Sequence, residues 1–276
     1  MTERLHPQTH VNPSICPKKP QETPAPKAPI PNQILCDDAI SLMKTWPSQS
    51  FDACITDPPY NIAKNRKGLK WAFSNHVTMQ SDWDRFIDED YEAFTLAWLK
   101  EVCRVVKKNG NIFIFGTYHN IYLIGAIAQK FDLRIVNSII WAKPNAQPNI
   151  TCRMLTESTE QIIWLCNNTS KKATKWTFNY QEAKKLNEGK QMRNFWHFPL
   201  TPPSEKICGK HPSQKPLNLM ERLVLLATNP KDFVLDCFAG SGSTLVACKK
   251  NQRRFLGIEK NSEYCSISSA RLKLIE

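Results

Sequence analysis

The chain is poor in glycine, in paired cysteines and in long apolar runs, and each shortage excludes a class of protein. No apolar run approaches the eighteen residues of a membrane span, and no apolar core resembles a secretion signal, so we expect a cytoplasmic protein. Its ten cysteines form no C-x-x-C pair, so the usual zinc pairing is absent and we predict no metal site. Cys54, Cys103, Cys166 and Cys237 stand in apolar stretches, which is typical of small buried side chains in a reducing compartment.

Positive charge is what the chain has in excess. Its 37 Lys and Arg outnumber its 25 Asp and Glu, which gives a formal net charge of +12 at pH 7. A surface of this sign favours polyanions as partners. Because many basic proteins bind no nucleic acid, the charge by itself identifies no function.

The first 31 residues differ in composition from the rest of the chain. They hold eight prolines and few large apolar residues, so we predict a disordered or loosely attached arm over residues 1–31. Beyond it, short apolar strands alternate with amphipathic helices, which predicts one α/β domain over 32–276 with a mostly parallel sheet covered on both faces. Strands are expected at 34–35, 51–56, 112–115, 134–141, 161–165, 233–236 and 255–259. Helices are expected at 91–106, 121–129, 216–227, 244–250 and in the last residues.

Two of the nine glycines stand in one turn that follows a strand. Residues 233–244 read Phe-Val-Leu-Asp-Cys-Phe-Ala-Gly-Ser-Gly-Ser-Thr, so Gly240 and Gly242 lie between a strand and the start of a helix. Glycines let a ligand approach the backbone closely, and the helix start offers free N–H groups. Glu259 ends the next strand nineteen residues after Gly240, where an acidic side chain can bind ribose hydroxyls.

The same turn departs from the dinucleotide-binding fingerprint. Leu245 occupies the position of the third glycine, and Asp236 before the turn would repel a pyrophosphate. An acid at this place suits a cationic ligand, which favours an aminoacyl nucleoside over NAD. From these residues alone, a purely structural turn is the alternative.

A second strand ends in the turn Asp57-Pro58-Pro59-Tyr60. We expect it at the carboxyl edge of the sheet, where ligands bind in open α/β folds. The prolines remove two consecutive N–H donors, so the turn presents only hydrogen-bond acceptors. The Asp57 carboxylate and a carbonyl, most naturally that of Pro58, can hold the two hydrogens of a base amino group, while Tyr60 stacks on the base. An ordinary strand-ending turn is the alternative interpretation.

With both turns present in this order, the chain resembles the amino-methyltransferase family of DNA methyltransferases. It is similar to the beta group, and within it to the N6-adenine enzymes of the MboII or HinfI type found in restriction–modification systems. The resemblance covers about residues 32–275. It implies a Rossmann-like methyltransferase fold with a seven-stranded sheet, one antiparallel strand near 161–165 and a circularly permuted order of motifs. It also implies S-adenosylmethionine as methyl donor and a base flipped out of duplex DNA as substrate.

The resemblance also assigns residues to the cofactor. The run His211-Pro-Ser-Gln-Lys-Pro216 resembles the motif that approaches its methionine end, and Asp38 matches the acid near its adenine, although Asp37 replaces the usual glycine. Asp38 can also cap a helix that begins at Ala39. The expected cofactor-binding residues are Asp38, Ala39, Asp57, His211, Ser213, Lys215, Asp236, Phe238, Gly240, Ser241, Gly242 and Glu259. The expected catalytic residues are Asp57, Pro58, Pro59 and Tyr60.

Basic and aromatic residues interleave in the polar stretch before this motif. Between Lys143 and Lys215 there are twelve Lys or Arg and five acidic residues, together with Trp176, Phe178 and Trp196 among other aromatics. Such a mixture fits phosphate contacts combined with base contacts, so we assign target recognition to about 145–210. A second basic stretch, Lys64–Trp71, is expected to form a mobile loop over the flipped base.

Three functions remain open from the sequence. The first is site-specific methylation of adenine N6 in duplex DNA, with methylation of cytosine N4 as its variant, since cytosine-N4 members more often carry serine in place of Asp57. The second is methylation of RNA or of a protein amide, and the third is a nucleic-acid-binding subunit without catalysis. The family resemblance adds a homodimer, a cognate restriction endonuclease without stable contact and a location at the nucleoid as expected partners and place.

Overall fold

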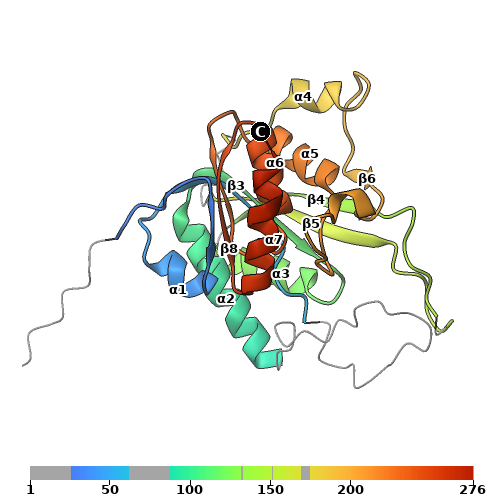
Figure 1. Cartoon of the computed structure of the whole chain (residues 1–276), viewed down its shortest axis with the longest axis horizontal. Coiled ribbons are helices and arrows are strands. Elements are labelled where there is room, and N and C mark those ends of the chain that lie inside the picture. Colours follow the sequence, from blue (N-terminus) through green and yellow to red (C-terminus); the bar gives the residue numbers. More distant parts are fainter. Residues whose placement is uncertain (1–25, 62–87, 132, 151, 169–174, 276) are drawn as a thin grey trace, which may run out of the picture.

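The computed structural model describes residues 26–61, 88–131, 133–150, 152–168 and 175–275 (Figure 1). The helices are α1 (Ala39–Lys44), α2 (Asp88–Val105), α3 (Ile121–Lys130), α4 (Tyr180–Lys185), α5 (Leu217–Ala227), α6 (Ser243–Lys250) and α7 (Ser262–Lys273). The strands are β1 (Gln33–Cys36), β2 (Phe51–Thr56), β3 (Val106–Gly116), β4 (Arg134–Ala142), β5 (Thr159–Cys166), β6 (Phe195–His197), β7 (Phe233–Asp236) and β8 (Arg254–Glu259). The predicted strands and helices are confirmed, with ends that shift by up to three residues except at β3, which begins at Val106, the residue predicted to end the preceding helix, and not at Ile112.

The eight strands form one sheet in the order β1-β8-β7-β2-β3-β5-β4-β6. All neighbours pair in parallel except β5, which runs antiparallel to both β3 and β4, as predicted for residues 161–165. The expected count of seven strands is exceeded by one because β6, only three residues long, adds to the edge beside β4. A three-residue strand inside a polar stretch leaves too little alternation in the sequence to reveal it.

Helices cover both faces of the sheet, and the side chains of each strand alternate between two apolar layers. Ile112 and Ile114 of β3 join the layer under α1, α2 and α3, where Trp98 is fully buried. Phe113 and Phe115 of the same strand face the layer under α5 and α6. Burial of each such side chain contributes roughly 1.5–3 kcal/mol, so this double layer is the main stabilising feature of the fold.

The cysteines follow the expectation that they act as small apolar residues. Cys54, Cys166 and Cys237 are buried, and Cys103 packs partly buried against the first apolar layer. Burial raises the pKa of the Cys166 thiol to about 11 and that of Cys103 to about 12. Both thiols are therefore neutral and unreactive at physiological pH.

The segment predicted to recognise the target divides between the two edges of the sheet. The carbonyl of Thr177 accepts from Asn111, which pairs with Ala53 near the start of β2 and with Cys166 at the end of the antiparallel β5. Asn179 donates to the carbonyls of Leu225 and Thr228 at the end of α5. Residues 175–190, with α4, therefore lie at the amino edge. The β4–β5 loop and the residues that follow β6 lie at the carboxyl edge, because Ala142 pairs with His197 at the ends of these strands.

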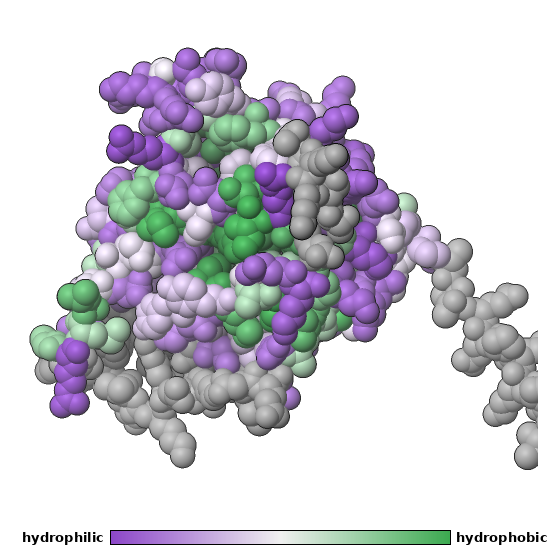
Figure 2. Space-filling model, turned by 180° about the vertical axis from the view of Figure 1, so that it is seen from behind, coloured by the Kyte–Doolittle hydropathy of each residue, from purple (hydrophilic) through white to green (hydrophobic). Residues whose placement is uncertain are grey.

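The β4–β5 loop projects beyond the carboxyl edge (Figure 1). Its tip exposes Ile150, Met154 and Leu155, the last with 90% of its surface accessible. From behind, hydrophobic side chains gather at the end of this projecting loop (Figure 2). None of the helices in the described ranges is long and apolar enough to span a membrane.

Candidate active site

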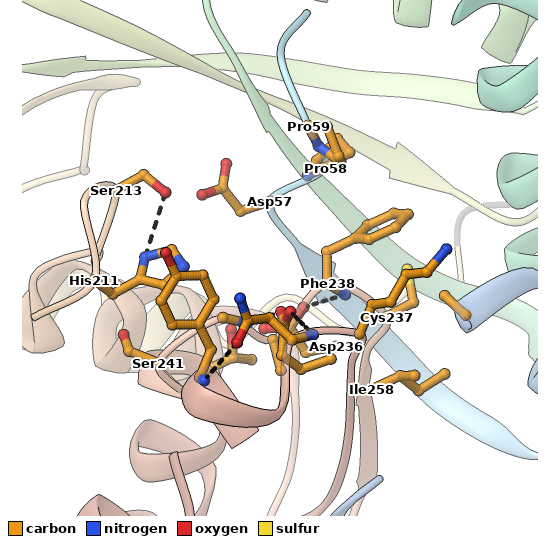
Figure 3. A pocket seen from close by; sticks show the side chains of 18 of the residues that line it. Asp57, Pro58, Pro59, His211, Ser213, Asp236, Cys237, Phe238, Ser241 and Ile258 are labelled. Atoms are coloured by element: carbon orange, nitrogen blue, oxygen red, sulfur yellow. Dashed lines mark hydrogen bonds between the residues drawn. The ribbon is translucent and has the colours of Figure 1, made fainter. Parts of the chain in front are cut away.

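The two turns identified in the sequence meet at the carboxyl edge of the sheet. β2 and β7 are neighbours, but from β2 the chain continues to β3 on one side, and from β7 it continues to β8 on the other. Open α/β sheets bind ligands at such a reversal of strand order. A cavity of about 630 Å³ lies here, within the size range of small-molecule sites. Figure 3 shows Asp57 and Phe238 projecting into it from the two strand ends, opposite His211 and Ser213.

The cavity collects nearly all of the site residues expected from the sequence. Gly242 is the exception, since it does not line the cavity. The expected residues that do line it are Asp38, Ala39, Asp57, Pro58, Pro59, Tyr60, His211, Ser213, Lys215, Asp236, Phe238, Gly240, Ser241 and Glu259.

Asp57 is held on both carboxylate oxygens by other side chains. The Tyr60 hydroxyl donates to Oδ1 at 2.5 Å, and Lys215 Nζ forms an ion pair with Oδ2. Glu160, at the start of β5, completes the cluster, because its Oε2 lies 3.2 Å from the Tyr60 hydroxyl and 3.4 Å from Lys215 Nζ. Its Oε1 lies 3.4 Å from Lys143 Nζ. Two carboxylates and two ammonium groups thus share one site.

Burial and mutual attraction set the protonation of this cluster. Burial raises the pKa of Asp57 above its ordinary value, against the opposing effect of the Lys215 ammonium. Burial alone would lower the pKa of Lys215, but the carboxylates of Asp57 and Glu160 outweigh it and raise that pKa. Burial also raises the pKa of Tyr60, so its hydroxyl stays protonated and donates a hydrogen bond.

Asp38 and Glu259 form the acidic end of the cavity beside β1 and β8. Asp38 caps α1 as expected, since its Oδ1 accepts from Ser41 N at 3.0 Å. Asp37, which stands where the family usually has glycine, does not need a positive φ and accepts from Asp38 N at 2.7 Å. Glu259 accepts from Gly240 N at 2.9 Å and from Asn261 N at 2.8 Å. Both acids are oriented by backbone donors, which leaves further lone pairs for ligand hydroxyls.

Asp236 lies deep in the cavity between the two turns. Its Oδ1 accepts from Thr56 Oγ1 at 3.0 Å and from Phe238 N at 3.2 Å, and burial raises its pKa to about 7. Phe238 is fixed from behind by Phe94 and Trp98, at ring-centroid distances of 5.9 and 5.6 Å. This part of the cavity pairs an acid with an aromatic wall, which suits a cationic ligand with an apolar body.

The two glycines of the turn act differently. Gly240 adopts φ +50°, and a Cβ there would lie 3.0 Å from Nε2 of His211. The His211 ring packs edge-on against Tyr264 at 4.2 Å, and burial lowers its pKa to about 3, so the imidazole is neutral. Gly242, at φ +77°, precedes α6, and a Cβ there would meet Oγ of Ser268 at 2.1 Å. Gly242 therefore permits the contact of α6 with α7.

Several residues of the site are not predicted from the sequence. Glu160 gave no local signal, because it lies 100 residues after Tyr60 and only the pairing of β5 with β3 brings it near. The Tyr91 hydroxyl donates to the carbonyl of Pro59 at 2.7 Å, whereas the sequence pattern predicts only a helix at this residue. Tyr264 and Ile258 line the cavity beside Glu259, where the end of an apolar strand was the available signal. The expected loop at 64–71 and residues 1–25 of the arm predicted over 1–31 fall outside the described residues, and within the described part Lys27 N donates to the carbonyl of Thr45 at 3.2 Å.

This architecture defines an α/β protein of Rossmann-like topology, in which an acidic cavity and the Asp57–Tyr60 turn meet where the strand order reverses. The family model for DNA methylases of the N6/N4 type matches residues 51–270. This chain belongs to that DNA methylase family.

Similar proteins cover most of the chain. It is 38% identical over 237 residues to the Type II methyltransferase M2.LlaDCHI of Lactococcus lactis subsp. cremoris, with 85% of this chain and 87% of the relative covered. It is 39% identical over 238 residues to the Type II methyltransferase M2.DpnII of Streptococcus pneumoniae, with 86% and 87% covered. The crystal structure of the M1.HpyAVI–SAM complex is 30% identical, with a TM-score of 0.65 over 87% of this chain and 98% of that one. PvuII DNA methyltransferase, cytosine-N4-specific, shares the fold at 17% identity and a TM-score of 0.67, with 86% of this chain and 85% of that one covered.

Proposed function

We propose that this protein transfers a methyl group from S-adenosylmethionine to N6 of an adenine flipped out of duplex DNA. Membership in the DNA methylase family and its likeness to two Type II methyltransferases make it a site-specific DNA methyltransferase of the restriction–modification kind. The observation that carries the residue roles is the meeting of Asp57–Tyr60 with the acidic cavity at the β2–β7 boundary. The structure similar to this chain that was solved with SAM supports the choice of cofactor.

The cavity fits a nucleoside that carries a cationic aminoacyl chain. Asp38 and Glu259 would hold the nucleoside end, Phe238 would pack on it, and Asp236 would lie near the positive charge. His211 stays neutral and approaches Gly240, so it adds no positive charge that would oppose a sulfonium. When bound, S-adenosylmethionine supplies an electrophilic methyl carbon.

The catalytic turn prepares the acceptor nitrogen. The lone pair of an adenine amino group is delocalised into the ring, and acceptors that bind its two hydrogens favour a tetrahedral nitrogen with a free lone pair. Asp57 would supply one acceptor and the carbonyl of Pro58 the other. The carbonyl of Pro59 is already bound by the Tyr91 hydroxyl, which anchors the turn. The methyl group would pass to the nitrogen as the carbon–sulfur bond breaks and leaves its electron pair on sulfur, and the nitrogen would then give one proton to the Asp57 carboxylate that binds it, and from there to water.

DNA recognition is proposed for the carboxyl edge. Within 145–210, the β4–β5 loop and the residues after β6 lie on the side of the catalytic turn, whereas residues 175–190 lie at the opposite edge. The exposed apolar tip of the β4–β5 loop, with Leu155, has the chemistry of side chains that wedge between bases. We also infer from the family a homodimer, a cognate nuclease and a location at the nucleoid, which sedimentation, genomic context and cell imaging would test.

Nucleoside mass spectrometry of DNA treated with the purified protein and S-adenosylmethionine tests this function. N6-methyladenine is the expected product, and N4-methylcytosine alone would contradict the choice of adenine. The Asp57→Ala variant is expected to lose methyl transfer by at least about a hundredfold while cofactor and DNA binding are largely retained, because the carboxylate acts mainly on the reacting nitrogen. Undiminished transfer by this variant would contradict the role of the turn.

A further inference from the structure

The Tyr60 hydroxyl faces two carboxylates but has one proton to donate. It donates to Asp57 Oδ1 at 2.5 Å, and Glu160 Oε2 lies 3.2 Å away as a second acceptor. Lys215 Nζ is shared in the same way, since it contacts Asp57 Oδ2 and lies 3.4 Å from Glu160 Oε2. The side chain of Glu160 therefore competes with Asp57 for both of its partners.

This competition matters because each oxygen of Asp57 already accepts from one charged or buried donor. An amino group that donates to Asp57 must use the remaining lone pair of an oxygen that the Tyr60 hydroxyl or the Lys215 ammonium also occupies, so those two donors weaken the new hydrogen bond unless another acceptor draws them away. If the Tyr60 hydroxyl moved away from Asp57 and found no other acceptor, it would be a buried, unsatisfied donor, which costs free energy. Glu160 offers that acceptor from the opposite side.

We propose that Glu160 is a positioning residue for methyl transfer, which takes up the Tyr60 hydroxyl and part of the Lys215 charge so that Asp57 is released to the target amino group. This inference rests on the proposed function. Glu160 does not line the cofactor cavity, so it acts through Tyr60 and Lys215. Lys143, with its Nζ 3.4 Å from Glu160 Oε1, holds the carboxylate from outside and keeps the charges of the cluster balanced.

The Glu160→Gln variant tests the proposal, because glutamine preserves the shape and removes the charge. The single-turnover rate of DNA methylation is expected to fall about tenfold to a hundredfold, the effect of weakening one hydrogen bond to a charged group. Cofactor affinity, measured by calorimetry, is expected to stay within about twofold of the wild type. A rate within twofold of the wild type, or a loss of cofactor affinity equal to the loss of rate, would overturn the proposal.

The pH profile separates positioning from a merely structural role. Lys215, Tyr60, Glu160 and Asp236 are the ionisable groups around Asp57, and the Glu160 carboxylate is one cause of its raised pKa. In Glu160→Gln the pKa of Asp57 falls, so the acid limb of the rate profile moves to lower pH while the plateau drops. An unmoved acid limb would contradict the proposed contact.

A double-mutant cycle tests the part played by the hydroxyl. In a Tyr60→Phe background no hydroxyl occupies Asp57, so the Glu160→Gln penalty is expected to shrink at least threefold. Equal penalties in both backgrounds would overturn the idea of a shared proton. Glu92→Gln, which removes an exposed carboxylate paired with Lys130 at 3.1 Å on the helical face, is the matched control and should behave as wild type. If the wild type methylates no DNA, the proposed function is contradicted. That outcome differs from the ones that would overturn the role of Glu160, so the two failures can be told apart.

Discussion

Asp236 and Glu259 end neighbouring strands and line the same cavity, yet their surroundings prepare them for different partners. Glu259 has one backbone donor on each oxygen, which leaves it as an oriented acceptor for hydroxyl groups. Asp236 is 3% exposed and has a pKa raised by burial to about 7, so a considerable fraction is protonated at neutral pH. A positive charge close by would reverse that effect, since it favours the ionised form.

We therefore expect cofactor binding to be linked to the ionisation of Asp236. A cationic ligand lowers its pKa, so binding at pH 7 releases part of a proton, and affinity weakens as the pH falls below about 7. Calorimetry in buffers of different ionisation enthalpy measures the released proton. In Asp236→Asn, affinity should fall by at least about tenfold and its pH dependence between 6 and 8 should disappear. An unchanged proton release in that variant would show that another group titrates.

The same substitution should stabilise the free protein. The pKa of Asp236 is higher in the folded state than in the unfolded one, so the folded state binds more protons between about pH 4 and 7. The free energy of unfolding therefore falls as the pH rises through this window. Asp236→Asn removes the penalty and should gain on the order of 2–4 kcal/mol above pH 7, measured by urea denaturation. A loss of stability at pH 8 would contradict this account.

Among the helices and strands, the turn from β7 to α6 has one glycine that lines the cavity and one that permits helix packing. Gly240 makes room for His211 at the cavity, whereas Gly242 makes room for Ser268 of α7. Both have positive φ, where a side chain is strained. The two glycines resemble one ligand-binding motif in the sequence, but in the fold they permit two different contacts, one with His211 and one with α7.

Gly242→Ala should destabilise the folded protein, although Gly242 does not line the cavity. The added Cβ would lie 2.1 Å from Ser268 Oγ, and the strained φ adds to the clash, so we expect a loss of about 2–4 kcal/mol in thermal or urea unfolding.

Ser268→Ala provides the control for that substitution. Among the described residues, Ser268 Oγ has no hydrogen-bond partner although it is buried, so this variant alone should be neutral or slightly stabilising. Combined with Gly242→Ala, it should recover part of the loss. Full additivity of the two changes would contradict the clash as the cause.

Across the whole molecule, positive charge lies at both edges of the sheet and is not concentrated at the edge proposed to bind DNA. Lys184, Lys185 and Lys190 belong to the segment at the amino edge, away from the catalytic turn. Arg153 lies in the β4–β5 loop, and Lys206 and Lys210 precede the cavity residue His211. Glu205, next to Lys206, accepts from Leu217 N at the start of α5. This contact places Lys206 and its neighbours at the carboxyl edge.

Two triple variants compare these groups. Replacing Arg153, Lys206 and Lys210 by glutamine should weaken DNA binding and reduce the magnitude of the salt slope by up to about 0.9 for each phosphate contact removed. Replacing Lys184, Lys185 and Lys190 by glutamine removes the same charge from the amino edge and should change the slope little. Titrations between low and moderate salt measure both, and equal effects would contradict the assignment of DNA to the carboxyl edge.

Local sequence patterns predict the alternation of strands and helices, the two turns and many of the residues that line the cavity. These features depend on local physics, since apolar periodicity, proline geometry and glycine conformations act within a few residues of the chain. The order of the turns along the chain also indicated the family before any contact was known.

Which charged side chains meet depends on how distant segments pack in three dimensions. Glu160 joins Tyr60 and Lys215 because β5 inserts between β3 and β4, and the segment after β5 divides between two edges because α4 packs on the end of α5. Such contacts join residues about fifty to a hundred positions apart in the chain, which no local pattern encodes. The cluster around Asp57 therefore depends on the topology of the sheet, whereas Asp57 itself is predicted from the local sequence.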